Sequence, residues 1–150
     1  MTNFSIEKNF NGPVIGLDEV GRGPLAGPVV SCGCYFKDYD SIKNQLKFIK
    51  DSKKISSIKR KKIFHYFIKL KNKNLMNYFL GIASVKEIDK LNILNATKLS
   101  MKRAIDKFKI PNATLIIDGN FKLNYKSYKE ESFIKGDQIS ASIAAASIIA

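Results

Sequence analysis

The sequence predicts one α/β domain, in which strands and helices alternate around a mixed sheet. Short apolar runs bounded by turn residues predict the strands, and longer segments with apolar residues at helical spacing predict the helices. The length of 150 residues is that of one compact domain, so we assign residues 1–150 to a single domain.

The first two predicted strands form a hairpin-like pair. The apolar run 14–17 ends abruptly in Asp18 and Glu19, a turn-rich loop covers residues 21–28, and residues 29–36 resume as a strand. Cys32 and Cys34 lie two positions apart in this second strand, so their side chains share one face. We interpret them as small buried hydrophobic residues, since two cysteines are too few for a zinc site.

Three helices and two further strands follow. Ser56 or Ser57 can cap a helix that runs to about residue 71, and the solitary His65 is expected on its surface. Strands are predicted over 75–83 and 114–117, the latter ending in Asp118, and helices over 92–108 and 139–150. The apolar stripes assigned to the first two helices are Ile63, Phe64, Phe67 and Ile68, then Leu94, Thr97, Met101, Ile105 and Phe108.

The charge balance points to a nucleic-acid partner. Lysine and arginine total 26 against 13 acidic residues, which gives a formal net charge of +13. Codon bias in an A/T-rich genome is an alternative source of the lysines, because Asn, Ile and Phe are also abundant. No apolar run reaches the length of a membrane span and the first ten residues do not form a secretory signal, so a cytoplasmic protein without a membrane partner is expected.

Acidic residues mark the candidate chemistry. Asp18, Glu19 and Asp118 follow apolar strands, and sites in open α/β sheets form at the carboxyl ends of strands. If those two strands are parallel neighbours the carboxylates meet, and Asp137, between a glycine and a helix start, can join them. Such a cluster needs cations, and oxygen ligands suit Mg²⁺ or Mn²⁺, two of which can hydrolyse a phosphodiester. The alternative is that these acids are ordinary surface residues.

Two polar loops could contact a substrate, although each is also an ordinary turn by its spacing. Gly21, Arg22 and Gly23 leave directly from the acidic pair, and glycines allow backbone N–H groups to approach a ligand closely. Lys53 and Lys54 precede the first long helix and could place two ammonium groups on phosphates.

Taken together, these segments resemble bacterial ribonuclease HII, of the ribonuclease H-like superfamily. The resemblance spans about residues 14–150, with the motifs in family order. They are residues 16–28 (GLDEVGRGPLAGP), 51–54 (DSKK), 87–97 (EIDKLNILNAT), 117–120 (IDGN), 135–137 (KGD) and 144–150 (AAASIIA).

The resemblance implies a ribonuclease H-like fold with the first and fourth strands adjacent, and two divalent ions, Mn²⁺ or Mg²⁺, with substrate bound. It implies catalytic, metal-binding roles for a set of four carboxylates, Asp18, Glu19, Asp118 and Asp137. It implies that Gly21, Arg22 and Gly23 recognise the 2′-hydroxyl of a ribonucleotide and that Lys53 contacts the nucleic-acid backbone.

The implied reaction is endonucleolytic hydrolysis of the RNA strand of RNA–DNA hybrids, and cleavage 5′ to ribonucleotides embedded in duplex DNA. It leaves 3′-hydroxyl and 5′-phosphate ends and serves RNA primer removal and ribonucleotide excision. We expect a monomer. Family members continue past the last helix into further helices, so a C-terminally shortened chain is expected. Two alternatives stay open, a DNA nuclease of the same superfamily and a truncated, non-catalytic nucleic-acid-binding remnant.

Overall fold

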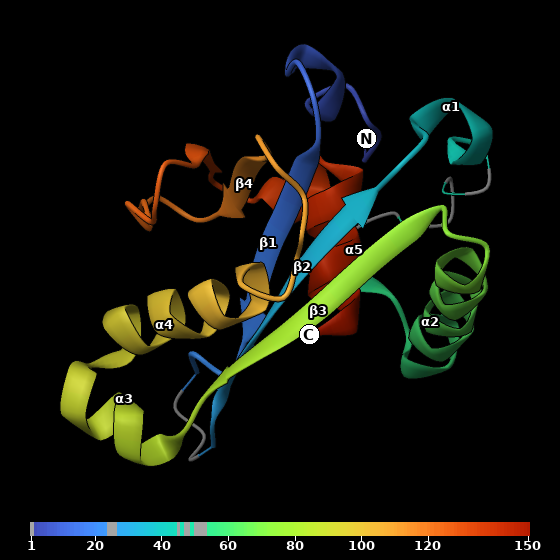
Figure 1. Cartoon of the computed structure of the whole chain (residues 1–150). Helices are drawn as coiled ribbons and strands as arrows, with labels where there is room; N and C mark the ends of the chain where they lie inside the picture. Colours follow the sequence, from blue (N-terminus) through green and yellow to red (C-terminus); the bar gives the residue numbers. More distant parts are fainter. Residues whose placement is uncertain (1, 24–26, 45, 47–48, 50–53) are drawn as a thin grey trace.

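The computed structural model describes residues 2–23, 27–44, 46, 49 and 54–150. Its elements follow the expected α/β order and are shown in Figure 1. They are η1 (Glu7–Asn9), β1 (Val14–Val20), β2 (Val29–Phe36), α1 (Tyr39–Ile42), α2 (Ser57–Asn72), β3 (Met76–Ala83), α3 (Val85–Leu91), α4 (Ile93–Ile105), β4 (Thr114–Asp118), β5 (Lys129–Phe133), η4 (Gly136–Gln138) and α5 (Ala141–Ile149).

The five strands form one mixed sheet in the order β3-β2-β1-β4-β5. Strand β2 is antiparallel to both β1 and β3, whereas β4 is parallel to both β1 and β5. The predicted hairpin-like pair and mixed sheet are therefore confirmed. The central position of β1 places the acidic residues of this strand in the middle of the sheet rather than at its edge.

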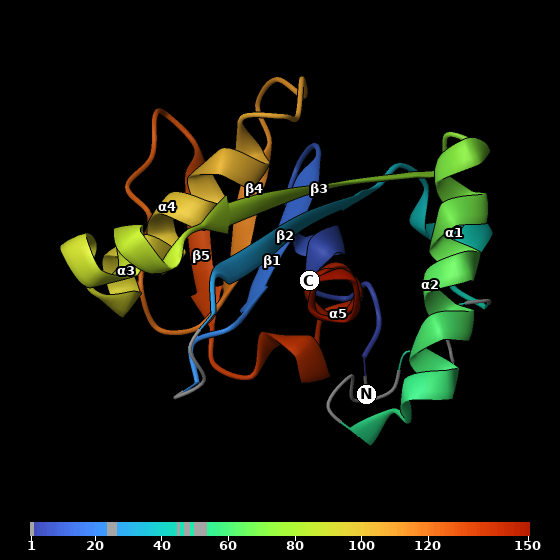
Figure 2. The ribbon, with the colours of Figure 1, turned by 90° about the horizontal axis from the view of Figure 1, so that it is seen from below.

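Helices cover both faces of the sheet. Figure 2 shows α3 and α4 over one face and α5 on the other, with α2 beside it. Ile15, Leu17 and Leu115 pack with Met101 of α4 on the first face. The alanines of α5 pack on the second face together with Phe67 of α2, and both cysteines lie in this cluster, buried and free as predicted.

Close backbone approach holds α5 against the sheet. A Cβ atom on Gly16 of β1 would lie 2.5 Å from the Ser142 carbonyl carbon, a distance that real Cβ atoms essentially never show. Glycine at this position therefore allows α5 to lie directly on β1. The small residues of α5, including Ala144 and Ala145, are fully buried in the same interface.

Several expectations need correction. The apolar face of α2 is Ile63, Tyr66, Phe67 and Leu70, and Ile68 points outward with 36% of its surface exposed. Spacing explains this, because these four residues follow the i, i+3, i+4, i+7 pattern of one helix face.

Two of the predicted helices are also shorter than expected. Helix α4 ends at Ile105, so Phe108 is buried outside the helix, and Leu94 is 37% exposed. Helix α5 begins at Ala141 rather than at residue 139, after the N-cap residue Ser140. None of the described helices combines the length and apolar character needed to cross a membrane.

Candidate active site

The carboxyl ends of β1 and β4 bring two of the predicted acids together. The parallel ladder between these strands ends at the pair Leu17–Ile117. The next residue on each strand is an aspartate, Asp18 on β1 and Asp118 on β4. Strand β1 continues to Val20 along β2, so Asp18 and Glu19 lie within the strand rather than in the loop that follows it.

These acids line an open pocket of about 400 Å³. Its wall is formed by β1, the loop after it, α2, the end of β4 and α5. The lining residues are Asp18, Glu19, Val20, Arg22, Arg60, Asp118, Gly119 and Ser147. Three of the four predicted carboxylates and the predicted arginine thus share one cavity.

Asp18 is the most perturbed carboxyl group of the pocket. Only 6% of the residue is exposed, and its Oδ1 accepts a hydrogen bond of 2.8 Å from the Glu19 N–H. Burial, followed by the charge of Asp118, raises the pKa of Asp18 to about 7, against the opposing effect of a hydrogen bond with the Ser147 side chain. Near neutral pH this carboxyl group is therefore poised between its charged and uncharged forms.

Glu19 is held by the loop that follows it. Its Oε1 lies 3.5 Å from Nη1 of Arg22, and its Oε2 is buried with no hydrogen-bond partner among the described residues. Burial raises the pKa of Glu19, while the Arg22 charge acts in the opposite direction. The Arg22 guanidinium also lies 5.9 Å from the ring centroid of Phe121. Arg22 therefore links Glu19 to the segment after β4.

The fourth predicted carboxylate does not line the pocket. Asp137 lies in η4 and is fully buried, and it is not among the residues that line the pocket. Its neighbour Gly136 donates its N–H to Oδ1 of Asp118 over 2.9 Å. The structure therefore connects Asp137 to the site through the backbone of η4.

The donor set fits a hard divalent cation. All the predicted ligands are carboxylates, and the raised pKa values of Asp18 and Glu19 show that burial and mutual repulsion disfavour their charged forms when no cation is present. The buried Oε2 of Glu19 is an oxygen that such an ion could bind. Among the described residues, however, no three acidic, cysteine or histidine side chains converge tightly enough to form a ready-made metal site.

The substrate loop is described in part. Gly21 has a φ of +100°, and a Cβ atom there would lie 2.5 Å from the Pro28 carbonyl oxygen, so the turn requires glycine. Gly23 has nothing within 4 Å of the equivalent position, so the fold itself does not require glycine there. Lys53 lies outside the described residues. His65 is exposed on α2, as predicted.

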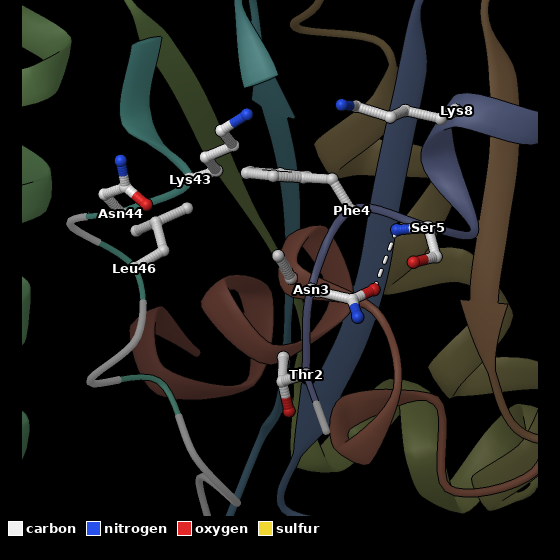
Figure 3. A pocket seen from close by; sticks show the side chains of 9 residues that line it. Thr2, Asn3, Phe4, Ser5, Lys8, Lys43, Asn44 and Leu46 are labelled. Atoms are coloured by element: carbon white, nitrogen blue, oxygen red, sulfur yellow. Dashed lines mark hydrogen bonds between the residues drawn. The ribbon is translucent and has the colours of Figure 1, made fainter. Parts of the chain in front are cut away.

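A second hollow near the N-terminus has different chemistry. Figure 3 shows this pocket of about 280 Å³, whose lining includes Thr2, Asn3, Lys8 and Lys43 and, among the described residues, no acidic side chain. It therefore lacks the carboxylates on which the predicted chemistry depends.

Comparison with known proteins identifies the family of the chain. The family model for ribonuclease HII matches residues 15–150, which contain all four carboxylates. The chain belongs to the ribonuclease HII family. Membership places it among the ribonuclease H-type hydrolases.

Curated relatives support the family assignment over nearly the whole chain. Ribonuclease HII of Wolbachia pipientis from Culex pipiens is 42% identical over 148 residues, which is 99% of this chain and 71% of the relative. The Fusobacterium nucleatum enzyme is 48% identical over 141 residues, covering 91% of this chain and 62% of its own length. Across the relatives compared, the chain spans 51% to 71% of their length.

Solved structures of related enzymes have the same ribonuclease H-like fold. The ribonuclease H2 of Pyrococcus horikoshii is similar with a TM-score of 0.69 and 26% identity, over 91% of this chain and 69% of the other. Bst-RNase HIII in complex with Mn²⁺ gives a TM-score of 0.65 at 22% identity, over 91% and 50% of the two chains. The predicted fold is confirmed by both, and the second shows divalent metal in a protein of this fold.

Two polar side chains in the pocket of this ribonuclease HII family member were not predicted from the sequence. Arg60 reaches the pocket from α2, and Ser147 reaches it from α5. The sequence contains some indication of Ser147, because it is one of only two polar residues, with Ser142, in a helix of alanine and isoleucine, and a buried hydroxyl group needs a polar neighbour. No feature of the sequence distinguished Arg60, since it lies in a run of four basic residues.

Proposed function

We propose that this chain is an endoribonuclease that hydrolyses the RNA strand of RNA–DNA hybrids and cuts 5′ to ribonucleotides embedded in duplex DNA. The observation that carries the proposal is the apposition of Asp18 and Asp118 at the ends of parallel neighbouring strands, in one pocket with Arg22. The family assignment supports the same chemistry. RNA primer removal and ribonucleotide excision would be its roles, and residues 1–150 would act as one catalytic domain, as a monomer in the cytoplasm.

Divalent cations belong to this proposal. Asp18, Glu19, Asp118 and Asp137 would hold two Mn²⁺ or Mg²⁺ ions, which when bound supply an activated water and stabilise the leaving oxygen. The surrounding residues of the chain set the protonation and the position of these carboxyl groups. Burial makes Asp18 retain its proton to near neutral pH, and the Arg22 guanidinium holds Glu19 by its Oε1.

Substrate selection would depend on the loop after β1. Gly21 and Gly23 leave their backbone N–H groups open to close approach, and the 2′-hydroxyl is the group that distinguishes RNA from DNA. Arg22 and Lys53 would contact the phosphate backbone, and the net charge of +13 would attract the duplex. The products would carry 3′-hydroxyl and 5′-phosphate ends.

The decisive experiment compares three duplexes of one sequence. We expect cleavage of the RNA–DNA hybrid and of DNA with a single ribonucleotide, in Mn²⁺ or Mg²⁺, and no cleavage of all-DNA. Asp118→Asn is expected to lower turnover by about 100-fold or more, the size of effect seen when a group that stabilises transition-state charge is removed. Asp106→Asn is the matched control, because Asp106 is an exposed acid paired with Lys126 at 2.8 Å.

Other results of this experiment would support an alternative function or refute the carboxylate site. Equal cleavage of all three duplexes would indicate a DNA nuclease of the same superfamily. Binding of the duplexes without cleavage would indicate a non-catalytic nucleic-acid-binding module. Undiminished turnover of Asp118→Asn would show that the proposed carboxylate site is wrong.

A further inference from the structure

The N-terminal segment carries a buried carboxylate that the proposed mechanism does not use. Glu7, in η1, is fully buried. Its Oε1 accepts hydrogen bonds from the Ser140 hydroxyl (2.6 Å) and from the Ser142 N–H (2.9 Å). Its Oε2 is also buried and has no hydrogen-bond partner among the described residues. A buried acid with an unsatisfied oxygen is costly, so packing alone does not account for it.

Glu7 and Ser140 together cap the start of α5. The Ser140 hydroxyl accepts from the Ile143 N–H at 3.1 Å while donating to Glu7, so the serine caps the helix directly. The Glu7 side chain accepts a hydrogen bond from the N–H of Ser142, one of the amides in the first turn of α5 that has no partner within the helix. The position of this helix end therefore depends on a residue more than 130 positions earlier in the chain.

The same N-terminal segment is bonded to the residues on either side of the cap. The Ala141 N–H donates to the Asn3 carbonyl over 2.8 Å, and Asn3 forms an isolated bridge with Ser140. The Thr2 hydroxyl lies 3.0 Å from the Gln138 carbonyl oxygen. Figure 3 shows this segment, where the Asn3 side chain accepts from the Ser5 N–H at 2.8 Å.

These contacts surround η4, which carries Asp137. Ser140 follows Asp137 by three residues, and its N–H donates to the Gly136 carbonyl over 2.9 Å. On the other side, Gly136 donates to Asp118. The η4 turn is thus held between the proposed site and the start of α5, and Glu7 fixes that start.

We propose that Glu7 is a positioning residue that places Asp137 for the proposed reaction, by holding the N-terminus of α5 through Ser140 and Ser142. This inference rests on the proposed function. It assigns to the segment before β1 a part in the site, although none of the side chains that the structure describes in this segment lines the carboxylate pocket.

The test compares variants of Glu7 with two controls. Glu7→Ala removes both hydrogen bonds, and it is expected to lower kcat and Mn²⁺ affinity by about tenfold. This is the lower end of the losses seen when a residue that orients a metal ligand is mutated. KM is expected to change less than kcat. Glu7→Gln retains an acceptor oxygen and is expected to restore most of the loss. Mn²⁺ affinity is measured by calorimetry without substrate, and hydrogen exchange reports the amides of Ser142 and Ile143.

The controls separate positioning from general destabilisation. Lys8→Met removes the 2.8 Å ion pair with Asp40, which holds the same segment to α1 instead of η4, and it is expected to leave kcat unchanged. Phe108→Leu destabilises a buried contact with Phe79 in the cluster on the α4 face of the sheet, which contains no residue of α5 or η4. If Phe108→Leu lowers kcat and Mn²⁺ affinity as much as Glu7→Ala does, the proposal is wrong.

Two further results would overturn it. If Glu7→Ala keeps the wild-type kcat and Mn²⁺ affinity, Glu7 does not position a residue of the site. Unchanged hydrogen exchange of the Ser142 amide in this variant would lead to the same conclusion. If the wild-type chain cleaves none of the duplexes, the proposed function fails. The calorimetry and exchange measurements then still decide whether Glu7 positions the segment that carries Asp137.

Discussion

Replacing Asp18 by asparagine is expected to stabilise the metal-free protein while abolishing cleavage. The substitution keeps the shape of the side chain, and the asparagine oxygen can still accept from the Glu19 N–H. It removes a charge that burial and Asp118 disfavour in the folded state. The site would then lose a predicted metal ligand and gain stability through the same change.

The size of the gain depends on pH. The pKa of Asp18 rises from 3.8 to about 7 in the folded state, so between these values the folded protein binds more protons than the unfolded chain. Wild-type stability therefore falls as pH increases through this range, whereas the asparagine variant has nothing to titrate at this position. A difference of about three pKa units corresponds to a free energy of unfolding on the order of 4 kcal/mol.

The assay is urea denaturation of both proteins in a metal chelator, at a series of pH values from 4 to 8.5. The variant is expected to gain relative to wild type as pH rises from about 4, with a plateau above about 7. For a chain of this size, the plateau corresponds to roughly 8–16 °C in Tm. Adding Mn²⁺ is expected to stabilise the wild type more than the variant.

A surface acid supplies the control. Asp40 is exposed, and its hydrogen bond with Lys8, together with the charges of Lys8 and Lys43, lowers its pKa. Asp40→Asn is therefore expected to produce no gain at neutral pH. If the stability difference between Asp18→Asn and wild type does not grow between pH 4 and 7, Asp18 is not the perturbed group described above, and the electrostatic argument for a cation at this pocket is refuted.

The remaining predictions concern the loop after β1. Arg22→Ala is expected to weaken duplex binding, to reduce the slope of log affinity against log salt by about 0.9, and to raise the pKa of Glu19 further. An unchanged salt slope would show that Arg22 contacts no phosphate. Gly21→Ala is expected to destabilise the fold by about 1–3 kcal/mol because of its positive φ and its contact with the Pro28 carbonyl. Gly23→Ala is expected to leave thermal stability unchanged, so that any loss of cleavage reports a substrate contact, and a large loss of stability would contradict the description of this loop.

The predictable part of the fold is the part with local apolar signals. Strands β1, β2 and β4 each contain a buried apolar run bounded by turn or acidic residues, and these runs identify them in the sequence. Strand β5, with the sequence KEESF, was not predicted. Its composition does not indicate a strand, and it is one because it pairs with β4. Its Glu130 side chain accepts from the N–H groups of Leu123 and Tyr125, a role that no local pattern reveals.

Helix α3 was missed for a different reason. It is only seven residues long and none of them is fully buried, so it has no apolar stripe to detect. Its capping box, formed by Ser84 and Glu87, was visible in the sequence. Arg103 of α4 then binds Glu87 at 2.6 Å and donates to the Ile82 carbonyl, which ties α3 to the end of β3. The signal existed locally, but the contacts that stabilise the helix come from elsewhere in the chain.

The candidate site could likewise be predicted only in part. The meeting of Asp18 and Asp118 was predicted only on the condition that their two strands are parallel neighbours, and the resemblance to ribonuclease HII supplied that condition. The structure confirms the parallel pairing of β1 and β4. The burial of Asp137 and its separation from the pocket wall depend on η4, Gly136 and the contacts of the N-terminal segment with α5. Those contacts join residues more than 130 positions apart. The pairing of β1 with β4 thus brings Asp18 and Asp118 together, whereas the placement of Asp137 depends on a turn that local patterns do not predict.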